Sequence, residues 1–322
     1  MAVWYNANEK KHEVQPMKLS FDEHDTYQPD PYIFEDGDKL YLYVTCVRGV
    51  EAYSANDLFS TWHYEGVVTC FSDGAYDFWA PAVIKIDGIY YMYVSCEKGD
   101  RFQHLHVAKA TSPLGPFTHE KELYPRFTID AHMVKTKAGL FLFYAENSTV
   151  GERIGTRVFV DRFLDPYTPA NAPRELITPD FDEEIFTPSY REDNKWHTIE
   201  GPFWFREGDY QYLMYSGGCF QDDTYHVGYA VAKSSEEDLT RVDFVKHTNG
   251  DRFAPVLIRN EFEEGTGHHS VIKHNGTYYA IYHGRDYGII RTSGIDEARS
   301  ARICRLTVDG GRITAERFED RV

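Results

Sequence analysis

The chain has 322 residues, of which 16% are aromatic, and a formal net charge of -17 at pH 7. This length is enough for one large domain with a substantial core, and the many Tyr and Phe residues favour β-strands. An acidic chain without a Lys/Arg cluster lacks the basic face of a nucleic-acid binder. No run approaches the ~18 apolar residues of a membrane-spanning helix, so we expect neither nucleic acid nor membrane as a partner.

The cysteines and the N-terminus bear on the compartment of the protein. There are 5 cysteines, an odd number, and none of them forms a C-x-x-C pair. We therefore expect neither a zinc ribbon nor a disulfide scaffold. The first residues, MAVWYNANEKKHEVQP, contain no apolar segment like that of a secretion signal, and this pattern favours a cytoplasmic location.

In chain order, five stretches share one pattern: a leading residue, a short apolar run, a turn with Gly and a strand of alternating aromatics. Their leading residues are 49 to 70 positions apart. A unit repeated at this spacing predicts the blades of a β-propeller. The stretches are DPYIFEDGDKLYLYVT from Asp30, WAPAVIKIDGIYYMYVS from Trp79, DAHMVKTKAGLFLFYAE from Asp130, EGPFWFREGDYQYLMYSG from Glu200 and HHSVIKHNGTYYAIYHG from His268.

Further strands complete each unit, as in HLHVAKATSPLGPF (104–117) and YHVGYAVAKSSEEDL (225–239). We predict an all-β fold in which residues 1–322 form a single five-bladed β-propeller with about four strands per blade. The tail, ARICRLTVDGGRITAERF, is predicted to be a hairpin that closes the ring by pairing with N-terminal residues. The alternative is a β-sandwich, whose strands do not usually repeat a whole motif five times.

Three of the leading residues are acids. Because equivalent positions in a propeller converge on one axis, we expect Asp30, Asp130 and Glu200 to meet at one mouth of the central channel. Hydrolysis of a glycosidic bond needs two carboxyl groups, one to donate a proton and one to activate water or attack the sugar. Three like charges also perturb one another, so at least one of these acids should be protonated near neutral pH. Each acid alone is as well explained by a turn or a solvated surface, and their shared repeat position favours catalysis.

The same segments resemble glycoside hydrolase family 43, a family of inverting five-bladed propeller enzymes. The resemblance implies that Asp30 is the general base, that Glu200 is the general acid, and that Asp130 raises the pKa of Glu200 and orients it. The third unit departs from the family pattern, with Asp130-Ala131 in place of a frequent Asp-Pro. The matching segments are DPYIFEDGDKLYLYVT, FWAP (78–81), FTID (127–130), EGPFWF (200–205), GTGHHSVIKHNGTYYAIYHGR (265–285) and ARICRLTVDGGRI.

Three further residues are candidates for the site. Trp79 leads the second unit, where its indole is expected to stack on a sugar ring or else to pack between blades. Arg285 is expected to bind a sugar hydroxyl or to support Asp30 by charge, with a surface salt bridge as the alternative. The resemblance implies that His268 lies in the central channel and holds a calcium ion or a water cluster. A hydrogen-bonded core histidine is the alternative, since calcium prefers oxygen ligands.

The resemblance implies an exo-acting glycosidase that needs no cofactor beyond that possible calcium ion. We expect it to release terminal α-L-arabinofuranose from short plant-wall oligosaccharides, derived from arabinan or arabinoxylan. A β-xylosidase, an endo-arabinanase and a β-galactofuranosidase are alternatives within the family, because the loops around the site rather than the fold set specificity. A non-catalytic carbohydrate-binding propeller is the alternative from another class. The oligomeric state is left open.

Overall fold

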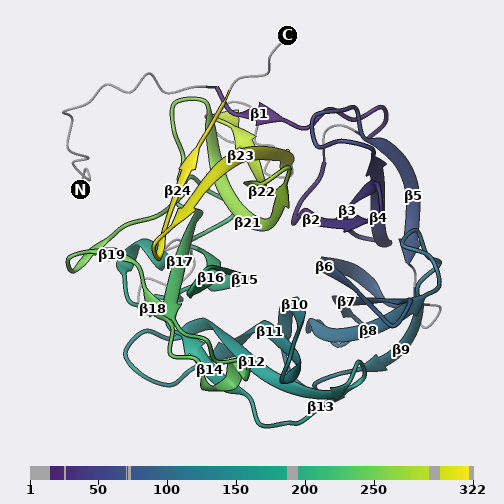
Figure 1. The fold of residues 1–322 in the computed structure, drawn as a ribbon, viewed down its shortest axis with the longest axis horizontal. Helices are drawn as coiled ribbons and strands as arrows, with labels where there is room; N and C mark the ends of the chain where they lie inside the picture. Colours follow the sequence, from purple (N-terminus) through teal and green to yellow (C-terminus); the bar gives the residue numbers. More distant parts are fainter. Residues whose placement is uncertain are drawn as a thin grey trace.

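A computed structural model describes residues 15–24, 27–69, 71, 74–186, 195–289 and 298–318. Its strands form five blades around a central axis (Figure 1), which confirms the predicted fold class. Within these ranges no helix is long and apolar enough to cross a membrane. The innermost strands are β2 (Tyr32–Asp36), β6 (Tyr76–Ile86), β10 (Thr128–Thr136), β15 (Ile199–Glu207) and β21 (Glu263–His274).

Each innermost strand continues outward through antiparallel neighbours. The first blade adds β3 (Lys39–Cys46), β4 (Gly49–Ala55) and β5 (His63–Thr69), and the second adds β7 (Ile89–Glu97), β8 (His104–Ala110) and β9 (Thr118–Glu122). The third adds β11 (Gly139–Ser148), β12 (Gly155–Asp165), β13 (Thr168–Pro169) and β14 (Arg174–Ile177). The fourth adds β16 (Tyr210–Gly217), β17 (His226–Lys233) and β18 (Val245–Lys246), and the fifth adds β22 (Thr277–Asp286), β23 (Ser300–Asp309) and β24 (Arg312–Glu316).

Some shorter elements of the described residues lie outside this plan. They are a small hairpin of β19 (Thr248–Asn249) and β20 (Arg252–Phe253), and the 3-10 helices η1 (Asp182–Glu184) and η3 (Leu239–Arg241).

Tight turns join the first two strands of every blade, at the places where the sequence has Gly between two apolar runs. In the second blade Ile86 pairs with Ile89, which leaves Asp87-Gly88 as a two-residue turn. Both turn residues have positive φ, 51° and 84°, as the hairpin turn that matches strand twist requires. Asn275-Gly276 makes the same turn in the fifth blade, with φ of 49° and 80°.

The alternating aromatic strands are buried on both faces. On β3, the side chains of Leu40, Leu42 and Val44 pack in a cluster with residues of the fifth blade. Tyr41 and Tyr43 point the other way, into a cluster with the second blade. Similar clusters fill the remaining junctions between neighbouring blades. The period-2 pattern therefore encodes sheets that pack face to face around a ring.

Both ends of the described chain take part in closing the ring. The short strand β1 (Met17–Lys18) pairs with β23, with Met17 opposite Ile303, and Figure 1 shows β1 beside β23 at the top of the fifth blade. This pairing confirms the predicted closure. Farther along the chain, Arg317 forms an ion pair with the fully buried Glu263, 2.5 Å away. The C-terminal segment is thereby held to the innermost strand of the fifth blade.

Candidate active site

A bulge interrupts four of the innermost strands close to the axis, and in the first blade the equivalent residue, Asp30, lies just before β2. The strand register shifts at the same point of β6, β10, β15 and β21. A bulge of this kind changes the direction of side chains. Here it places at the channel a residue whose backbone has the left-handed conformation. The five residues in this position are Asp30 (φ 54°), Ala80 (47°), Asp130 (61°), Gly201 (58°) and His268 (45°). Four of them are not glycine, and such strained backbone gathers at functional sites.

Glu200 departs from the expected repeat position. We expected it to be equivalent to Asp30 and Asp130, but their equivalent in the fourth blade is Gly201. Glu200 comes one residue earlier and pairs with Ser216, in the place that Trp79 takes opposite Ser95. The reason is local, because Gly201 adopts the left-handed conformation more readily than any other residue. The convergence of the three acids is nevertheless found.

Asp30 is a buried carboxylate held by several donors. Its Oδ2 accepts a 2.5 Å hydrogen bond from the Thr45 hydroxyl. Its Oδ1 lies 3.3 Å from Nδ1 of His268 and 3.5 Å from the Arg299 guanidinium, while His283 accepts the backbone N–H of Asp30. Burial by itself raises the pKa of Asp30, but His268, His283 and Arg299 outweigh it and hold this pKa well below the usual range. Asp30 is therefore ionised at neutral pH.

Glu200 has the opposite protonation behaviour. Burial and the negative charge of Asp30 raise the pKa of Glu200 to about 7, against the opposing effects of Tyr225 and Arg299. The Tyr225 hydroxyl donates a 2.6 Å hydrogen bond to Oε1 of Glu200. Tyr225 is itself fully buried and its ring stacks on that of His283, with 5.6 Å between centroids. Glu200 can thus carry a proton at neutral pH and is fixed by a rigid partner.

Asp130, the third acid of the site, is buried. Burial, followed by the charges of Glu200 and Asp30, raises the pKa of Asp130 well above its ordinary value. Its Oδ2 accepts a 2.9 Å hydrogen bond from the backbone N–H of Gly201. Because Asp130 and Glu200 interact, their protons are released in steps that belong to the pair. The raised pKa values of Asp130 and Glu200 agree with the prediction that at least one of the acids is protonated near neutral pH.

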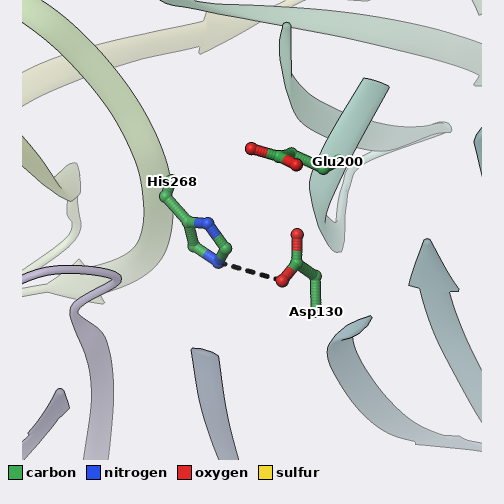
Figure 2. A group of neighbouring side chains, drawn as sticks. All are labelled: Asp130, Glu200 and His268. Carbon is green, nitrogen blue, oxygen red and sulfur yellow. Dashed lines mark ion pairs between the residues drawn. The ribbon is translucent and has the colours of Figure 1, made fainter. Parts of the chain in front are cut away.

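The ring of His268 lies close to two of the acids, Asp30 and Asp130. Figure 2 shows its ring and the carboxyl groups of Asp130 and Glu200 directed toward a common space, with the ring 4.0 Å from Asp130. Burial lowers the pKa of His268, so its neutral form is favoured. The cavity bordered by the five bulge residues has about 20 Å³ open to the centre of a water molecule. This is room for a water molecule.

The donor atoms of Asp130, Glu200 and His268 lie within 4.8 Å of one another, a spacing that could hold a metal ion. Calcium takes six to eight oxygen ligands, and this set offers it two carboxyl groups and one imidazole. The raised pKa values of both acids also favour protons over a cation there. The set fits calcium poorly, and we assign no step to a metal. The calcium expectation stays a prediction.

The two predicted substrate-binding residues differ in exposure, since Trp79 is partly exposed and Arg285 is buried. Trp79 is 38% exposed, so its indole is not fully buried between blades. Arg285 is fully buried, and its guanidinium donates to the carbonyl oxygens of Phe220 and Asp222. Contact between Arg285 and a sugar would require movement of this loop. The arginine beside Asp30 is Arg299 instead.

Sequence reasoning missed Arg299, Tyr225, His283 and Thr45. Nothing in the sequence around Arg299 or Tyr225 sets them apart. A signal for the other two was present, because the aromatic strands end in similar ways, as YVT at Thr45, YVS at Ser95 and YH at His283. A short polar residue after the last aromatics marks the strand end that faces the bulge.

Taken together, the fold and the carboxyl cluster are those of a propeller-type glycoside hydrolase. A model of glycosyl hydrolases family 43 matches residues 25–312. The chain belongs to this family, as its motifs indicated.

The chain is 24% identical over 284 residues to an extracellular exo-α-(1→5)-L-arabinofuranosidase of Streptomyces avermitilis, covering 80% of this chain and 54% of that protein. It is 23% identical to xylosidase/arabinosidase 43A of Humicola insolens, covering 75% of each. The chain thus spans about half the length of the Streptomyces relative.

Solved structures agree on the fold. A thermostable family-43 glycoside hydrolase superposes with a TM-score of 0.78 at 24% identity, covering 94% of this chain and 96% of that one. An α-L-arabinofuranosidase from Lactobacillus brevis gives a TM-score of 0.73 at 20% identity, covering 92% and 95%. These likenesses establish the fold alone.

Proposed function

We propose that this glycoside hydrolase is an inverting exo-glycosidase that releases terminal α-L-arabinofuranose from short plant-wall oligosaccharides. The observation that carries the chemistry is the contrast between two nearby acids. Asp30 is held ionised by its neighbours, whereas the pKa of Glu200 is raised to about 7. A base and an acid with separated pKa values are what general acid–base hydrolysis requires.

In the proposed mechanism, Asp30 removes a proton from the attacking water as that water approaches the anomeric carbon. Glu200 donates its proton to the glycosidic oxygen as the bond to the leaving group breaks. The raised pKa of Glu200 keeps this proton available at neutral pH, and Asp130 orients Glu200 by accepting the N–H of the adjoining Gly201. The Thr45 hydroxyl, 2.5 Å from Asp30, fixes the base during proton transfer.

The choice of sugar rests on the relatives. The Streptomyces relative is named as an exo-α-(1→5)-L-arabinofuranosidase, which supports both the arabinose and the exo parts of the proposal. The name of the Humicola relative includes xylosidase, and this favours β-xylosidase as the second candidate. The half-exposed Trp79 at the channel mouth gives either pentose an apolar surface on which to stack.

A panel of nitrophenyl glycosides tests the proposal. The purified protein is assayed on α-L-arabinofuranoside, β-D-xyloside and β-D-galactofuranoside, and on linear arabinan for endo action. We expect the highest kcat/KM on the arabinofuranoside. A higher value on the xyloside would replace the first candidate by the second. Shortened arabinan chains without release of free arabinose would contradict exo action. Sugar binding without turnover on any substrate would support a non-catalytic propeller.

A further inference from the structure

A series of hydrogen bonds joins neighbouring blades at the bulges. In each bond, the backbone N–H of a bulge residue donates to a side chain on the second strand of the preceding blade. The three bonds run from Ala80 to Oγ1 of Thr45 (2.8 Å), from His268 to Oγ of Ser216 (2.7 Å) and from Asp30 to Nδ1 of His283 (3.1 Å). The donors belong to the strained residues of the channel, so these bonds stabilise the left-handed backbone that aims the catalytic groups.

The accepting side chains share one register position. Ser216 lies opposite Glu200, and His283 lies opposite Gly267, which in both cases is the residue before the bulge. Thr45 is placed in the same way, since its N–H donates to the carbonyl of Pro29. At these three junctions a hydrogen-bond acceptor at this position serves the following blade, whereas Ser95 at the same position of the second blade donates to the Trp79 carbonyl.

The third blade has no hydrogen-bond acceptor at this position. Its residue at the shared position is Ala145, opposite Ile129, and a methyl group cannot accept a hydrogen bond. The N–H that such an acceptor would serve belongs to Gly201 in the fourth blade. It donates instead to Oδ2 of Asp130, at 2.9 Å. Ala145 is fully buried.

We propose that Ala145 is a positioning device of the site, because its methyl group leaves the Gly201 N–H to the Asp130 carboxyl. The peptide that carries this N–H joins Glu200 to Gly201. Asp130 is thereby a positioning residue that acts on Glu200 through a backbone hydrogen bond. The consequence for catalysis rests on the proposed function, whereas the hydrogen bond itself does not.

Four variants separate the hydrogen bond from the other effects of the Asp130 carboxyl group. Asp130→Asn removes the ionisable group and keeps an oxygen that can accept the Gly201 N–H. Asp130→Ala removes both. Asp130→Ala with Ala145→Ser, the serine double variant, restores an acceptor from the position that Ser216 occupies in the next blade. Asp130→Ala with Ala145→Cys, the cysteine double variant, is the control of similar shape, because a thiol is only a weak acceptor.

Hydrogen exchange of the Gly201 amide is the first measurement, and it needs no substrate. We expect exchange to rise by roughly tenfold in Asp130→Ala, as the loss of a buried hydrogen bond implies. It should stay near the wild-type rate in Asp130→Asn and fall again in the serine double variant. Equal exchange in Asp130→Asn and Asp130→Ala would overturn the proposal. Melting temperatures of all variants show whether each one is folded, and the two single variants decide the matter should the double variants not fold.

Turnover is the second measurement. On a glycoside with a poor leaving group, the serine double variant should regain about tenfold in kcat over Asp130→Ala, and the cysteine double variant should not. No recovery despite restored protection of Gly201 would show that this hydrogen bond does not position Glu200, and would overturn the proposed role in catalysis. A wild-type protein that hydrolyses no glycoside would instead contradict the proposed function, and the exchange result would stand.

Discussion

At the scale of single residues, the site shows how one kind of side chain is given two protonation states. Asp30 and Glu200 are both carboxyl groups at one channel mouth, and burial raises the pKa of each. His268, 3.3 Å from Asp30, together with His283 and the Arg299 guanidinium, holds the pKa of Asp30 low. Glu200 has one neutral donor, Tyr225, at 2.6 Å. The neighbours therefore decide which acid keeps its proton.

Substitution of the two acids should have different dependence on the leaving group. Asp30→Asn removes the base, so kcat should fall by roughly 10²–10⁴-fold or more on every substrate. Glu200→Gln should cause a similar loss on oligosaccharides but a much smaller one on nitrophenyl glycosides, whose leaving group needs little protonation. Steady-state kinetics on both substrate types checks this. An Asp30→Asn enzyme that keeps full activity would exclude Asp30 as the base.

The pH dependence should follow the same two groups. The acid must be protonated, so kcat/KM should fall as pH rises through about 7, the pKa of Glu200. The base stays ionised well below neutral pH, so the acidic side should stay active. Because the Tyr225 hydrogen bond lowers the pKa of Glu200, Tyr225→Phe should move the alkaline limb to higher pH. A limb that moves to lower pH in this variant would contradict the assignment of Glu200.

At the scale of strands, a glycine next to the site supports the same hydrogen bond. Gly267 is the residue before the bulge of the fifth blade, opposite His283. A Cβ atom on Gly267 would lie 2.2 Å from the ring of Tyr225, which is too close for the ring to stay in place. The space that Tyr225 needs thus comes from a glycine on a neighbouring blade.

Gly267→Ala should therefore impair catalysis by displacing Tyr225 from Glu200. We expect a drop in kcat of at least about tenfold, since a hydrogen bond to the acid is lost. Gly276→Ala is the matched control, because a Cβ there meets nothing within 4 Å. That residue has a φ of 80°, so the control should cost some stability while kcat is kept. Equal kcat in the two variants would show that the position of Tyr225 is unimportant.

The strands also show what the sequence could predict. Alternation such as Leu40 to Val44 on β3 depends only on the period of the chain, so blades and their number were predictable from repeats. The bulge was not, because one extra residue shifts the register without changing the pattern. The sequence therefore predicted that Glu200 is equivalent to Asp130, whereas the structural equivalent of Asp130 is the next residue, Gly201. Arg299 was missed for another reason, since it meets Asp30 only when the last blade closes beside the first.

At the scale of the whole molecule, the buried acids should affect stability as pH changes. The pKa of Glu200 rises from 4.5 to about 7 on folding. Between these values the native state holds a proton that the unfolded chain has released, so stability should fall as pH rises through this window. The effect is at most about 3 kcal/mol.

Glu200→Gln removes this contribution. Its melting temperature should exceed that of the wild type by a growing margin from pH 4 to pH 8, reaching a few degrees. Glu35→Gln, at an exposed residue of β2, is the control, and its melting temperature should change with pH in the same way as that of the wild type. Calorimetry at each pH measures both, and a margin that shrinks with rising pH would contradict the buried, protonated acid.

The closed ring brings acids from three blades to one mouth, and the central claim is that two of them hydrolyse the bond by inversion. Inverting enzymes hold their carboxyl groups roughly 6.5–9.5 Å apart to admit water, against ~5–5.5 Å for retaining ones. Proton NMR of the first sugar released, recorded before it mutarotates, tests the claim most directly. Release of arabinose from an α-arabinofuranoside should first give the β-anomer, with the α-anomer appearing later. An initial α-anomer would show retention, and Asp30 would then be a nucleophile rather than a base.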